Sequence, residues 1–446
     1  MLRIIFVILL SRFSLLYLKL FFRIMNKTFC IILFLVVISF WRCKTSEIPI
    51  SSKDVSTIYN PISALLHPEY IIYHNTDTTS LLFFKIRTFE LLYRAEEVTG
   101  KNRANLSIFY KIYPSLDSKE IIDSATTVLT LNKSPNNYLV SYIPIHLDFG
   151  KNYSIEILTS DNYRNTTNQQ IIEINKKDIS TNQFFLFTNK NTNQPLFKSF
   201  INDTLHFKIN NSLAGNKKIV IKKYISEFEP ALPPFSSQFE KFELSEPKEQ
   251  FIVENKKDID FTIANEGLYA FSVEEDDSLH TVINFFNPQY PEFKTPEQLL
   301  EGLIYLNASK EFKTLKQFEN PKFAVDSFWL NTTGNVERAK ELIRIYYNRA
   351  QLANYYFTTY KEGWKTDRGM IYLILGMPTT IFKTSTSETW TYGKSASYKA
   401  MEFNFEKEYH SFSNEHFVLR RSEIYDRLWY QAVDTWRNGR AFSIMN

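Results

Sequence analysis

The feature that most constrains this 446-residue chain is a series of short, β-prone segments between about residues 55 and 290. They are separated by Asn, Asp, Ser, Lys and Pro, at the roughly 8–12-residue spacing typical of β-sandwiches. In SIEIL (154–158) and LHFKIN (205–210), apolar residues occupy alternate positions, which indicates strands with one face toward a core. The predicted strands are Leu81–Phe89, Leu106–Tyr113, Thr126–Leu131, Tyr138–Ile145, Tyr153–Leu158, Gln170–Ile174, Phe184–Thr188, Thr204–Ile209, Lys218–Ile225, Phe251–Glu254, Asp260–Ile263, Leu268–Val273 and His280–Phe285.

These strands divide into two sets at KKDIST (176–181), which predicts one β-sandwich domain over 55–177 and a second over 178–290. The string NEGLYAFSVE (265–274) resembles the tyrosine corner of immunoglobulin-like domains, and FGKNYSIEI (149–157) is a looser version. A turn before an ordinary antiparallel strand is the alternative interpretation of both strings. We therefore predict two immunoglobulin-like sandwiches.

The hydrophobic period changes after residue 294, which predicts a C-terminal α+β domain over 297–446. Thr295, Pro296 and Gln298 form a helix-start signature, with Thr295 as the N-cap. Apolar residues spaced by three or four from Val336 to Phe357 predict a long helix capped by Asn335. The domain is predicted to hold helices within 297–360, a sheet within 366–421 and a terminal helix over 423–437. The predicted strands of that sheet are Gly369–Leu375, Glu388–Tyr392, Ala400–Phe405 and His416–Arg421.

The segment from Arg349 to Gly393 contains the string GWKTD (363–367), followed by Arg368–Gly369, by Gly376–Met377–Pro378 and by the pair Trp390 and Tyr392. It resembles the GWxTD domain family of exported bacterial proteins, and the likeness covers about 300–440. The resemblance implies a signal-bearing or lipoprotein chain of unestablished activity. Together with the strand pattern before residue 290, it gives the predicted fold class, which is a multidomain, mainly β protein with two immunoglobulin-like β-sandwich domains followed by a C-terminal α+β GWxTD domain.

We interpret the motif as a structural helix-to-strand junction. Gly363 is predicted to end the long helix in a left-handed conformation, and Trp364 to fill a crevice between that helix and the sheet. Thr366 and Asp367 are expected to accept backbone N–H bonds in a turn, and Arg368 to pair with a carboxylate.

The residues after the motif complete this interpretation. Gly369 is predicted to let a strand start close to the helix, and Gly376 and Pro378 to end that strand in a rigid turn. The pattern Leu375–Gly376–x–Pro378 with Trp390 and Tyr392 also resembles the small lipoprotein subunit of the outer-membrane β-barrel assembly machine. This looser likeness favours an envelope protein as the partner.

Residues 1–43 have the character of an export segment. From Met25, taken as the true start, Lys27 precedes an apolar run, Phe29–Trp41, that is shorter than the ~20 residues of a membrane span. Cys43 ends this run, which resembles a bacterial lipoprotein signal with Cys43 as the lipidated residue, although Trp41 and Arg42 are unusual there. A cleaved signal without lipid or an uncleaved anchor is the alternative. We expect a cell-envelope location, as an outer-membrane lipoprotein held to the membrane by this anchor.

Charge and cysteine content exclude several function classes. The first 43 residues hold six basic and no acidic residues, and subtracting these six from 52 leaves 46 basic against 48 acidic, a net charge of −2. That balance argues against a nucleic-acid partner. The only cysteines are Cys30 and Cys43, so residues 44–446 hold no disulfide, cysteine-ligated zinc or cysteine nucleophile.

An enzyme would need a nucleophile, a base or a metal set. The candidates in the C-terminal domain are Asp326, Asp367, Arg368, Glu388, His410 and His416. The six-residue separation of the two histidines does not match metal-ligand spacing, and no hydrolase motif is present. We therefore predict no catalytic residue, no metal and no cofactor.

The resulting hypothesis is a non-enzymatic envelope lipoprotein that acts as an interaction or scaffold subunit, with an outer-membrane protein assembly or secretion complex as the expected place of attachment. A glycan-binding surface protein and a hydrolase with its site in the GWxTD domain are the alternatives. An enzyme should have a deep pocket lined by charged groups with shifted pKa values, and a glycan binder an exposed planar aromatic row. A scaffold needs neither.

Membrane attachment is expected to depend on Cys43. Radiolabelled palmitate should enter the wild-type protein and not the Cys43→Ser variant, because no other thiol follows the apolar run. A Cys43→Ser variant that stays membrane-bound with an unprocessed signal would show that the segment is an anchor and not a lipoprotein signal.

Overall fold

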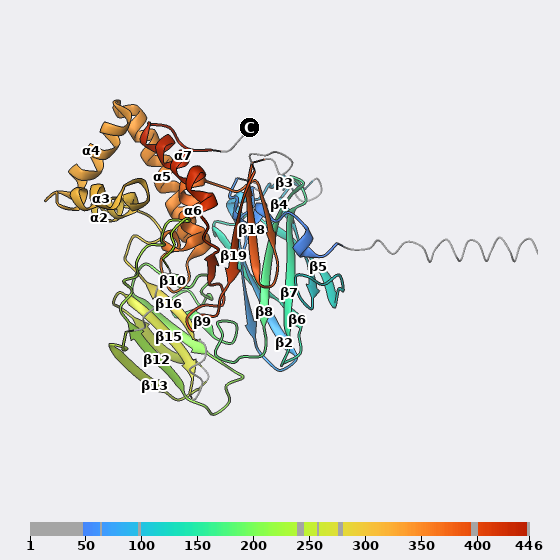
Figure 1. The fold of residues 1–446 in the computed structure, drawn as a ribbon. Coiled ribbons are helices and arrows are strands. Elements are labelled where there is room, and N and C mark those ends of the chain that lie inside the picture. The colour runs from blue at the N-terminus through green and yellow to red at the C-terminus, as the bar shows by residue number, and fades with distance from the viewer. Residues whose placement is uncertain are drawn as a thin grey trace, which may run out of the picture. The chain divides into compact units, whose positions relative to one another are not determined.

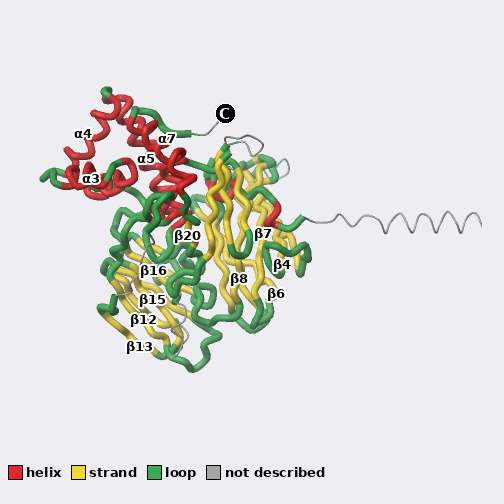
Figure 2. Tube along the Cα trace, in the orientation of Figure 1, coloured by secondary structure: helices red, strands yellow, loops and turns green. Residues whose placement is uncertain are grey.

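The computed structural model describes residues 48–62, 65–96, 100–238, 245–256, 258–274, 280–393 and 400–443. The predicted export segment, 1–43 with Cys43, lies outside these ranges. Pro49–Asn446 forms one compact unit, in which the helices gather at one end and the strands form the rest (Figure 2). In the described ranges, no helix combines the length and the apolar character that crossing a bilayer requires.

The first β-rich region is sandwich-like, with two antiparallel sheets enclosing one apolar core. One sheet has the order β1-β2-β6. The other has the order β3-β4-β7-β8, and β5 pairs with the edge of β4 opposite β7. Alternate residues are buried along β2 and β4. In SIEIL, however, residues 154–157 of β7 are all buried, so the prediction that this strand has only one face toward a core is wrong. The strands are β1 (Glu69–His74), β2 (Thr79–Arg87), β3 (Arg94–Ala95), β4 (Asn102–Tyr113), β5 (Asp123–Asn132), β6 (Tyr138–His146), β7 (Asn152–Asp161) and β8 (Thr166–Asn175).

The second β-rich region has its own core, in which Phe187, Phe207 and Phe271 pack edge to face. Its sheets have the orders β14-β11-β9 and β10-β16-β15-β12-β13. The Tyr269 hydroxyl donates to the Asn265 carbonyl at 2.9 Å, which is the bond expected of a tyrosine corner. The strands are β9 (Leu186–Asn189), β10 (Phe200–Ile201), β11 (Leu205–Asn210), β12 (Ile219–Tyr224), β13 (Glu249–Val253), β14 (Ile259–Ile263), β15 (Gly267–Val273) and β16 (Thr281–Phe285).

The C-terminal region combines helices with a four-stranded antiparallel sheet in the order β17-β18-β19-β20. The Thr295 hydroxyl and the Gln298 side chain form the predicted capping box of α2, and Asn335 caps α5 by accepting from the Arg338 N–H. The elements are α2 (Pro296–Gly302), α3 (Ser309–Lys316), α4 (Pro321–Thr333), α5 (Val336–Phe357), α6 (Asp367–Leu375), α7 (Asp426–Arg437), β17 (Thr380–Lys383), β18 (Ser387–Tyr392), β19 (Met401–Lys407) and β20 (Phe417–Leu419). Short 3-10 turns are η1 (Ile50–Ser52), η2 (Ser56–Tyr59), η3 (Thr88–Glu90), η4 (Leu303–Leu306), η5 (Gly363–Lys365) and η6 (Glu423–Tyr425).

The prediction of a strand at Gly369–Leu375 is wrong, because these residues belong to helix α6. Every residue of α6 is buried, so the sequence MIYLIL lacks the polar face by which helices are usually recognised. Consequently the sheet begins at β17 and not at 366. Gly376 then ends a helix and not a strand, with φ 85°.

The segment before the first sandwich packs into the C-terminal core. Ile50, Val55 and Tyr59 are buried in the same cluster as α5, α6 and the β17–β20 sheet. The Val55 N–H donates to the Ile381 carbonyl, and the Ile381 N–H donates to Asp54 Oδ1, so the segment lies along β17. Residues 50–59, the N-terminal segment, thus contribute to the α+β core, while the domain boundaries proposed from the sequence stay predictions.

Acid should destabilise the fold below pH 6.5, because His74 and His410 are buried in their neutral forms. Burial, with Lys176 adding to it, lowers the pKa of His74 to about 3, and burial with His416 beside it does the same for His410. Between pH 6.5 and 3 the unfolded chain binds more protons than the folded one, so stability falls as pH falls through this window. Each histidine should cost about 2 kcal/mol at pH 5 relative to pH 8.

Urea unfolding at pH 8 and pH 5 measures this loss. The variant His410→Phe keeps an aromatic ring against Tyr360, on which His410 stacks at 3.9 Å, but has no titrating group. It should recover about half of the loss. An unfolding free energy that is the same at both pH values would contradict the assignment.

Candidate functional site

The GWKTD segment lies where α5, η5 and α6 approach each other with their backbones in contact. A Cβ on Gly363 would lie 2.1 Å from the Ala353 carbonyl oxygen, and one on Gly369 would lie 1.8 Å from the Gly363 carbonyl oxygen. Both positions therefore require glycine for close approach. The prediction that Gly363 ends the long helix in a left-handed conformation is wrong, since α5 ends at Phe357 and Gly363 opens η5.

Trp364 is 4% exposed and packs among helical segments, not in the helix–sheet crevice that the sequence predicts. Its indole meets the rings of Phe293 and Tyr305 edge-on. The backbone N–H of Trp364 donates to the Asn354 side chain on α5, and the backbone carbonyl of Trp364 accepts from the Tyr305 hydroxyl. Trp364 therefore ties the start of the domain to its longest helix.

Thr366 and Asp367 start α6. The Thr366 hydroxyl accepts from the Gly369 N–H, which makes Thr366 the N-cap. Asp367 reaches across to the last strand of the sheet, where its carboxylate accepts from the Leu419 N–H at 2.7 Å and from the Arg421 guanidinium at 2.6 Å. This carboxylate therefore joins the motif helix to β20 and to the residues that follow it.

Arg368 points the other way, into a buried pair with Glu388 on β18. The shortest separation is 3.2 Å, and the two side chains are 4% and 0% exposed. Glu388 also accepts from the Tyr59 hydroxyl at 2.9 Å and the Trp390 indole at 3.1 Å, and Lys383 lies 3.2 Å away. A fully buried carboxylate thus has two cations and two neutral donors around it.

These partners decide the ionisation of Glu388. Burial alone would raise its pKa, but Arg368 and Lys383 outweigh burial and lower the pKa to about 2. Burial opposes the charge of Lys383 in the same way, yet Glu415 and Glu388 raise its pKa well above the ordinary value. The cluster therefore stays ionised at neutral pH.

The remaining residues singled out by the sequence form the turn and strand next to this cluster. The Tyr392 hydroxyl donates to the Gly376 carbonyl at 2.8 Å, and a Cβ on Gly376 would come within 3.0 Å of the Arg349 guanidinium. Pro378 is buried in the turn between α6 and β17. The turn after α6 is thus fixed to β18 by a hydrogen bond and by packing.

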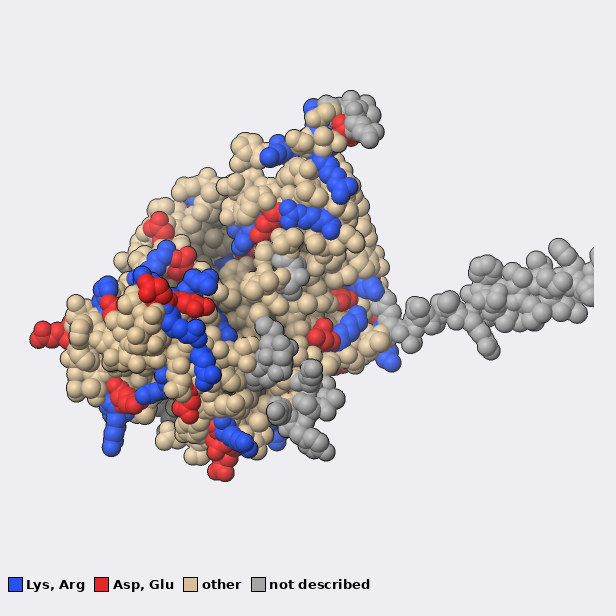
Figure 3. Space-filling view, turned by 90° about the horizontal axis from the view of Figure 1, so that it is seen from above, with Lys and Arg blue, Asp and Glu red and all other residues tan. Residues whose placement is uncertain are grey.

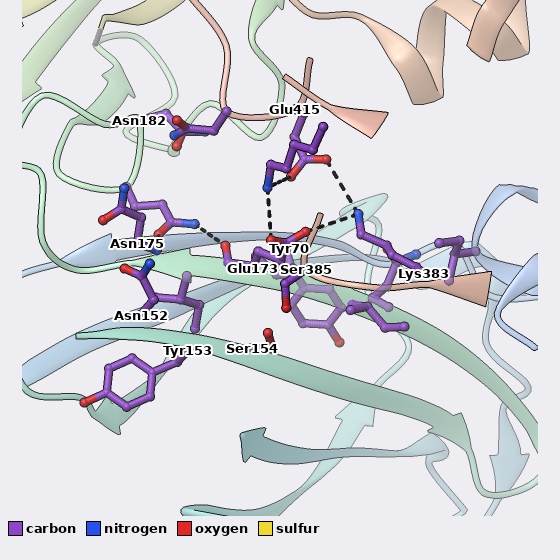
Figure 4. A pocket seen from close by; sticks show the side chains of 18 of the residues that line it. Tyr70, Asn152, Tyr153, Ser154, Glu173, Asn175, Asn182, Lys383, Ser385 and Glu415 are labelled. Carbon is purple, nitrogen blue, oxygen red and sulfur yellow. Dashed lines mark hydrogen bonds and ion pairs between the residues drawn. The ribbon is translucent and has the colours of Figure 1, made fainter. Parts of the chain in front are cut away.

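A polar cavity of about 690 Å³ lies between the first β-rich region and this sheet. Figure 4 shows Lys383 and Glu415 from the C-terminal region facing Glu173 of β8. Its walls come from β1, β7, β8, the end of α5 and the loops around β17, β19 and β20, with lining residues that include Tyr70, Asn152, Gln170, Asn175, Tyr355 and Lys407. The volume falls within the roughly 300–1,000 Å³ of ordinary small-molecule sites.

The charges of the cavity wall are paired with each other. Lys407 donates to Glu173 at 3.0 Å and lies 3.9 Å from Glu415, while Lys383 lies 3.6 Å from each of these carboxylates. Burial raises the pKa of Glu173. Burial opposes ionisation of Glu415, but the nearby cations Lys383, Lys407 and Arg368 outweigh it and lower the pKa of this carboxyl. Two carboxyl groups with opposite pKa shifts therefore share one cavity.

Arg368 and Glu388 were both among the charged candidates, and the structure pairs them, as predicted for Arg368 and a carboxylate. No sequence pattern indicated the neighbouring residues Tyr59, Glu173, Lys383, Lys407 and Glu415. The other candidates lie elsewhere. Asp326 pairs with Lys322 on α4. His410 and His416 lie 4.9 Å apart beside Tyr360, and the described residues contain no group of three His, Cys, Asp or Glu side chains arranged to hold a metal.

One face of the molecule carries charged side chains of both signs (Figure 3). In the view from above in Figure 3, basic and acidic side chains lie interspersed. A mixed face of this kind lacks the continuous basic stripe that phosphate backbones require.

Replacing Glu388 should destabilise the protein strongly, because Glu388→Gln leaves Arg368 and Lys383 buried without their shared counter-charge. Breaking a buried pair in this way costs about 3–5 kcal/mol. The control is Glu337→Gln, which removes the partner of Lys340 from an exposed pair on α5 and should change stability by no more than about 0.5 kcal/mol. Denaturant unfolding of both variants tests this prediction. If Glu388→Gln unfolded at the same midpoint as Glu337→Gln, the cluster would not contribute to the stability of the fold.

Residues 267–438 match the family model described as the GWxTD domain. The match begins at Gly267, the first residue of β15, ahead of the boundary at 297 predicted from the period change. No curated protein matches the chain.

Proposed function

Since this chain belongs to the GWxTD domain-containing family, we propose that it is a non-enzymatic cell-envelope lipoprotein that serves as an interaction or scaffold subunit. In this proposal the GWxTD segment has a structural role: it holds the helices, the β17–β20 sheet and the N-terminal segment in one fixed arrangement. Partner proteins bind the rigid body that results.

One observation carries the proposal: each side chain of the motif is buried and engaged inside the molecule. Trp364 is packed between two rings, and Thr366 caps α6. Lys365 pairs with Glu362 at 2.9 Å, and Asp367 with Arg421. A motif whose groups are all used for packing and pairing suits a structural role better than a reacting one.

The envelope location and the immunoglobulin-like assignment belong to the same proposal. The export signal with Cys43 supports an outer-membrane lipoprotein. The tyrosine-corner bond of Tyr269 and the similar contact between the Tyr153 hydroxyl and the Asp148 N–H support immunoglobulin-like sandwiches. Tandem rigid β-domains on a lipid tether suit a protein that presents surfaces to an envelope partner.

The proposal is tested by cross-linking in intact cells, followed by sizing of the cross-linked complex. Wild-type protein should migrate in a discrete complex larger than the single chain. Trp364→Ala should lose that complex in proportion to its loss of fold, because truncating a buried tryptophan costs about 3–5 kcal/mol. Glu337→Gln, on the exposed face of α5, should retain it.

Two results would overturn the proposal. One is a wild-type chain that stays uncomplexed at every cross-linker concentration. The other is a Trp364→Ala variant that melts like wild type yet loses the complex, since the motif would then be a direct contact surface.

The alternative with a specific observation behind it is a hydrolase that uses the cavity. Glu173, with its raised pKa, would act as the general acid, and Glu415, with its lowered pKa, as the base or nucleophile. Chromogenic glycoside, ester and peptide substrates test this. Turnover that disappears in both Glu173→Gln and Glu415→Gln, with unchanged melting, would favour the hydrolase, and no turnover in wild type would exclude these substrate classes.

A further inference from the structure

The cavity runs along the open edge of a β-sheet. Strand β8 pairs with β7 on one side, and the described residues place no strand on its other side. Six consecutive residues of β8, 170–175, line the cavity. Side chains alternate between the faces of a sheet, so a cavity that touches consecutive residues lies beside the backbone edge itself.

The direction of the backbone groups on this edge follows from the hydrogen bonds at the end of the strand. The Lys176 N–H donates to the Lys151 carbonyl, and the Lys176 carbonyl accepts from the Gly150 N–H, so Lys176 faces β7. In an antiparallel pair the direction alternates with each residue. Asn175, Glu173 and Ile171 therefore direct their backbone N–H and C=O groups away from β7.

An amide already occupies part of this edge. The side chain of Gln183 accepts from the Asn175 N–H at 2.9 Å and donates to the Glu173 carbonyl at 2.7 Å. One residue of a parallel neighbouring strand would make the same two bonds, with its own C=O accepting from the Asn175 N–H and its own N–H donating to the Glu173 carbonyl. Beyond Gln183, the Glu173 N–H and both backbone groups of Ile171 have no hydrogen-bond partner within the described ranges.

We propose that an extended peptide segment of a partner protein adds as a strand to the β8 edge at Ile171–Glu173, inside the cavity. The inference rests on the proposed interaction function and names the chemistry of the partner. Strand addition satisfies the open N–H and C=O groups through the backbone of the incoming segment.

The walls set the side-chain pattern of that segment. Ile172 packs against the core of the first sandwich, whereas the Glu173 side chain points to Lys407 on the opposite wall. Alternate residues of the peptide would therefore meet an apolar wall and a charged one. The charges of the charged wall are paired with each other. The peptide residues that face this wall should therefore be polar, and they should not all carry charge of the same sign.

The experiment uses the full chain and a phage-displayed library of random heptapeptides. Peptides with alternating apolar and polar residues should be enriched. A synthetic copy of an enriched peptide should slow hydrogen exchange at the Ile171 and Glu173 amides about tenfold or more, while the amides of Ile172 and Ile174, directed toward β7, serve as the internal reference.

Matched variants localise the binding. Ile171→Pro removes an outward N–H at an edge position, where proline is tolerated, and should weaken the peptide about tenfold or more. Ile171→Val keeps the N–H and should bind like wild type. Should Ile171→Pro fail to fold, Ser385→Trp places a large side chain on the cavity wall outside β8, leaves the sequence of β8 unchanged and should weaken the peptide in the same way (Figure 4).

Binding that is unaffected by both Ile171→Pro and Ser385→Trp, or the absence of any enriched peptide, would overturn the inference. Those results leave the proposed function standing if the cross-linked complex still forms in cells. Loss of the complex in wild type would instead remove the function itself.

Discussion

The architecture depends on one buried charge. Glu388 is completely excluded from solvent and would be costly to bury alone. The groups that compensate it come from four places in the chain: Tyr59 from the N-terminal segment, Arg368 from the motif helix, Lys383 from β17 and Trp390 from its own strand. Satisfying this carboxylate therefore requires the N-terminal segment, α6 and the sheet to be in place together. Through Lys383 the cluster extends to Glu173, so it also binds the first β-rich region to the C-terminal one (Figure 1).

The same requirement explains why the motif has the residues it has. Arg368 can reach Glu388 only if α6 starts close to α5, and Gly363 and Gly369 permit that approach because any Cβ there would overlap a backbone carbonyl. Thr366 fixes the first turn of α6, and Asp367 anchors it to the residues at β20, so that the neighbouring Arg368 projects toward the sheet. Trp364 fills the space on the opposite side. The five residues of the motif thus act together in packing α6 against α5 and the sheet.

The strands of both β-rich regions and helix α5 could be predicted because their patterns are local: short β-prone runs bounded by turn residues for a strand, and three-to-four spacing with an Asn cap for a helix. Helix α6 could not, since burial on all sides removes the periodicity on which such a prediction rests. The charge cluster was only partly visible for a different reason. Tyr59 and Glu388 are 329 positions apart, and Glu173 lies in another β-region, so no spacing in the sequence relates them. Arg368 was predicted to pair with a carboxylate, but which carboxylate depends on the tertiary fold.

The open edge of β8 exposes the molecule to a risk of aggregation. Unpaired strand edges invite aggregation, and proteins usually cover them or place charges beside them. Here both measures are present, because α5 and the β17–β20 sheet stand over the edge and Lys383, Lys407 and Glu415 lie beside it. Yet the cover leaves about 690 Å³ unfilled, where larger side chains could have closed the gap. A shielded edge with room for one strand excludes wide sheets and admits a single extended segment. The C-terminal domain would then limit access to the β8 edge, so that an edge prone to aggregation binds selectively.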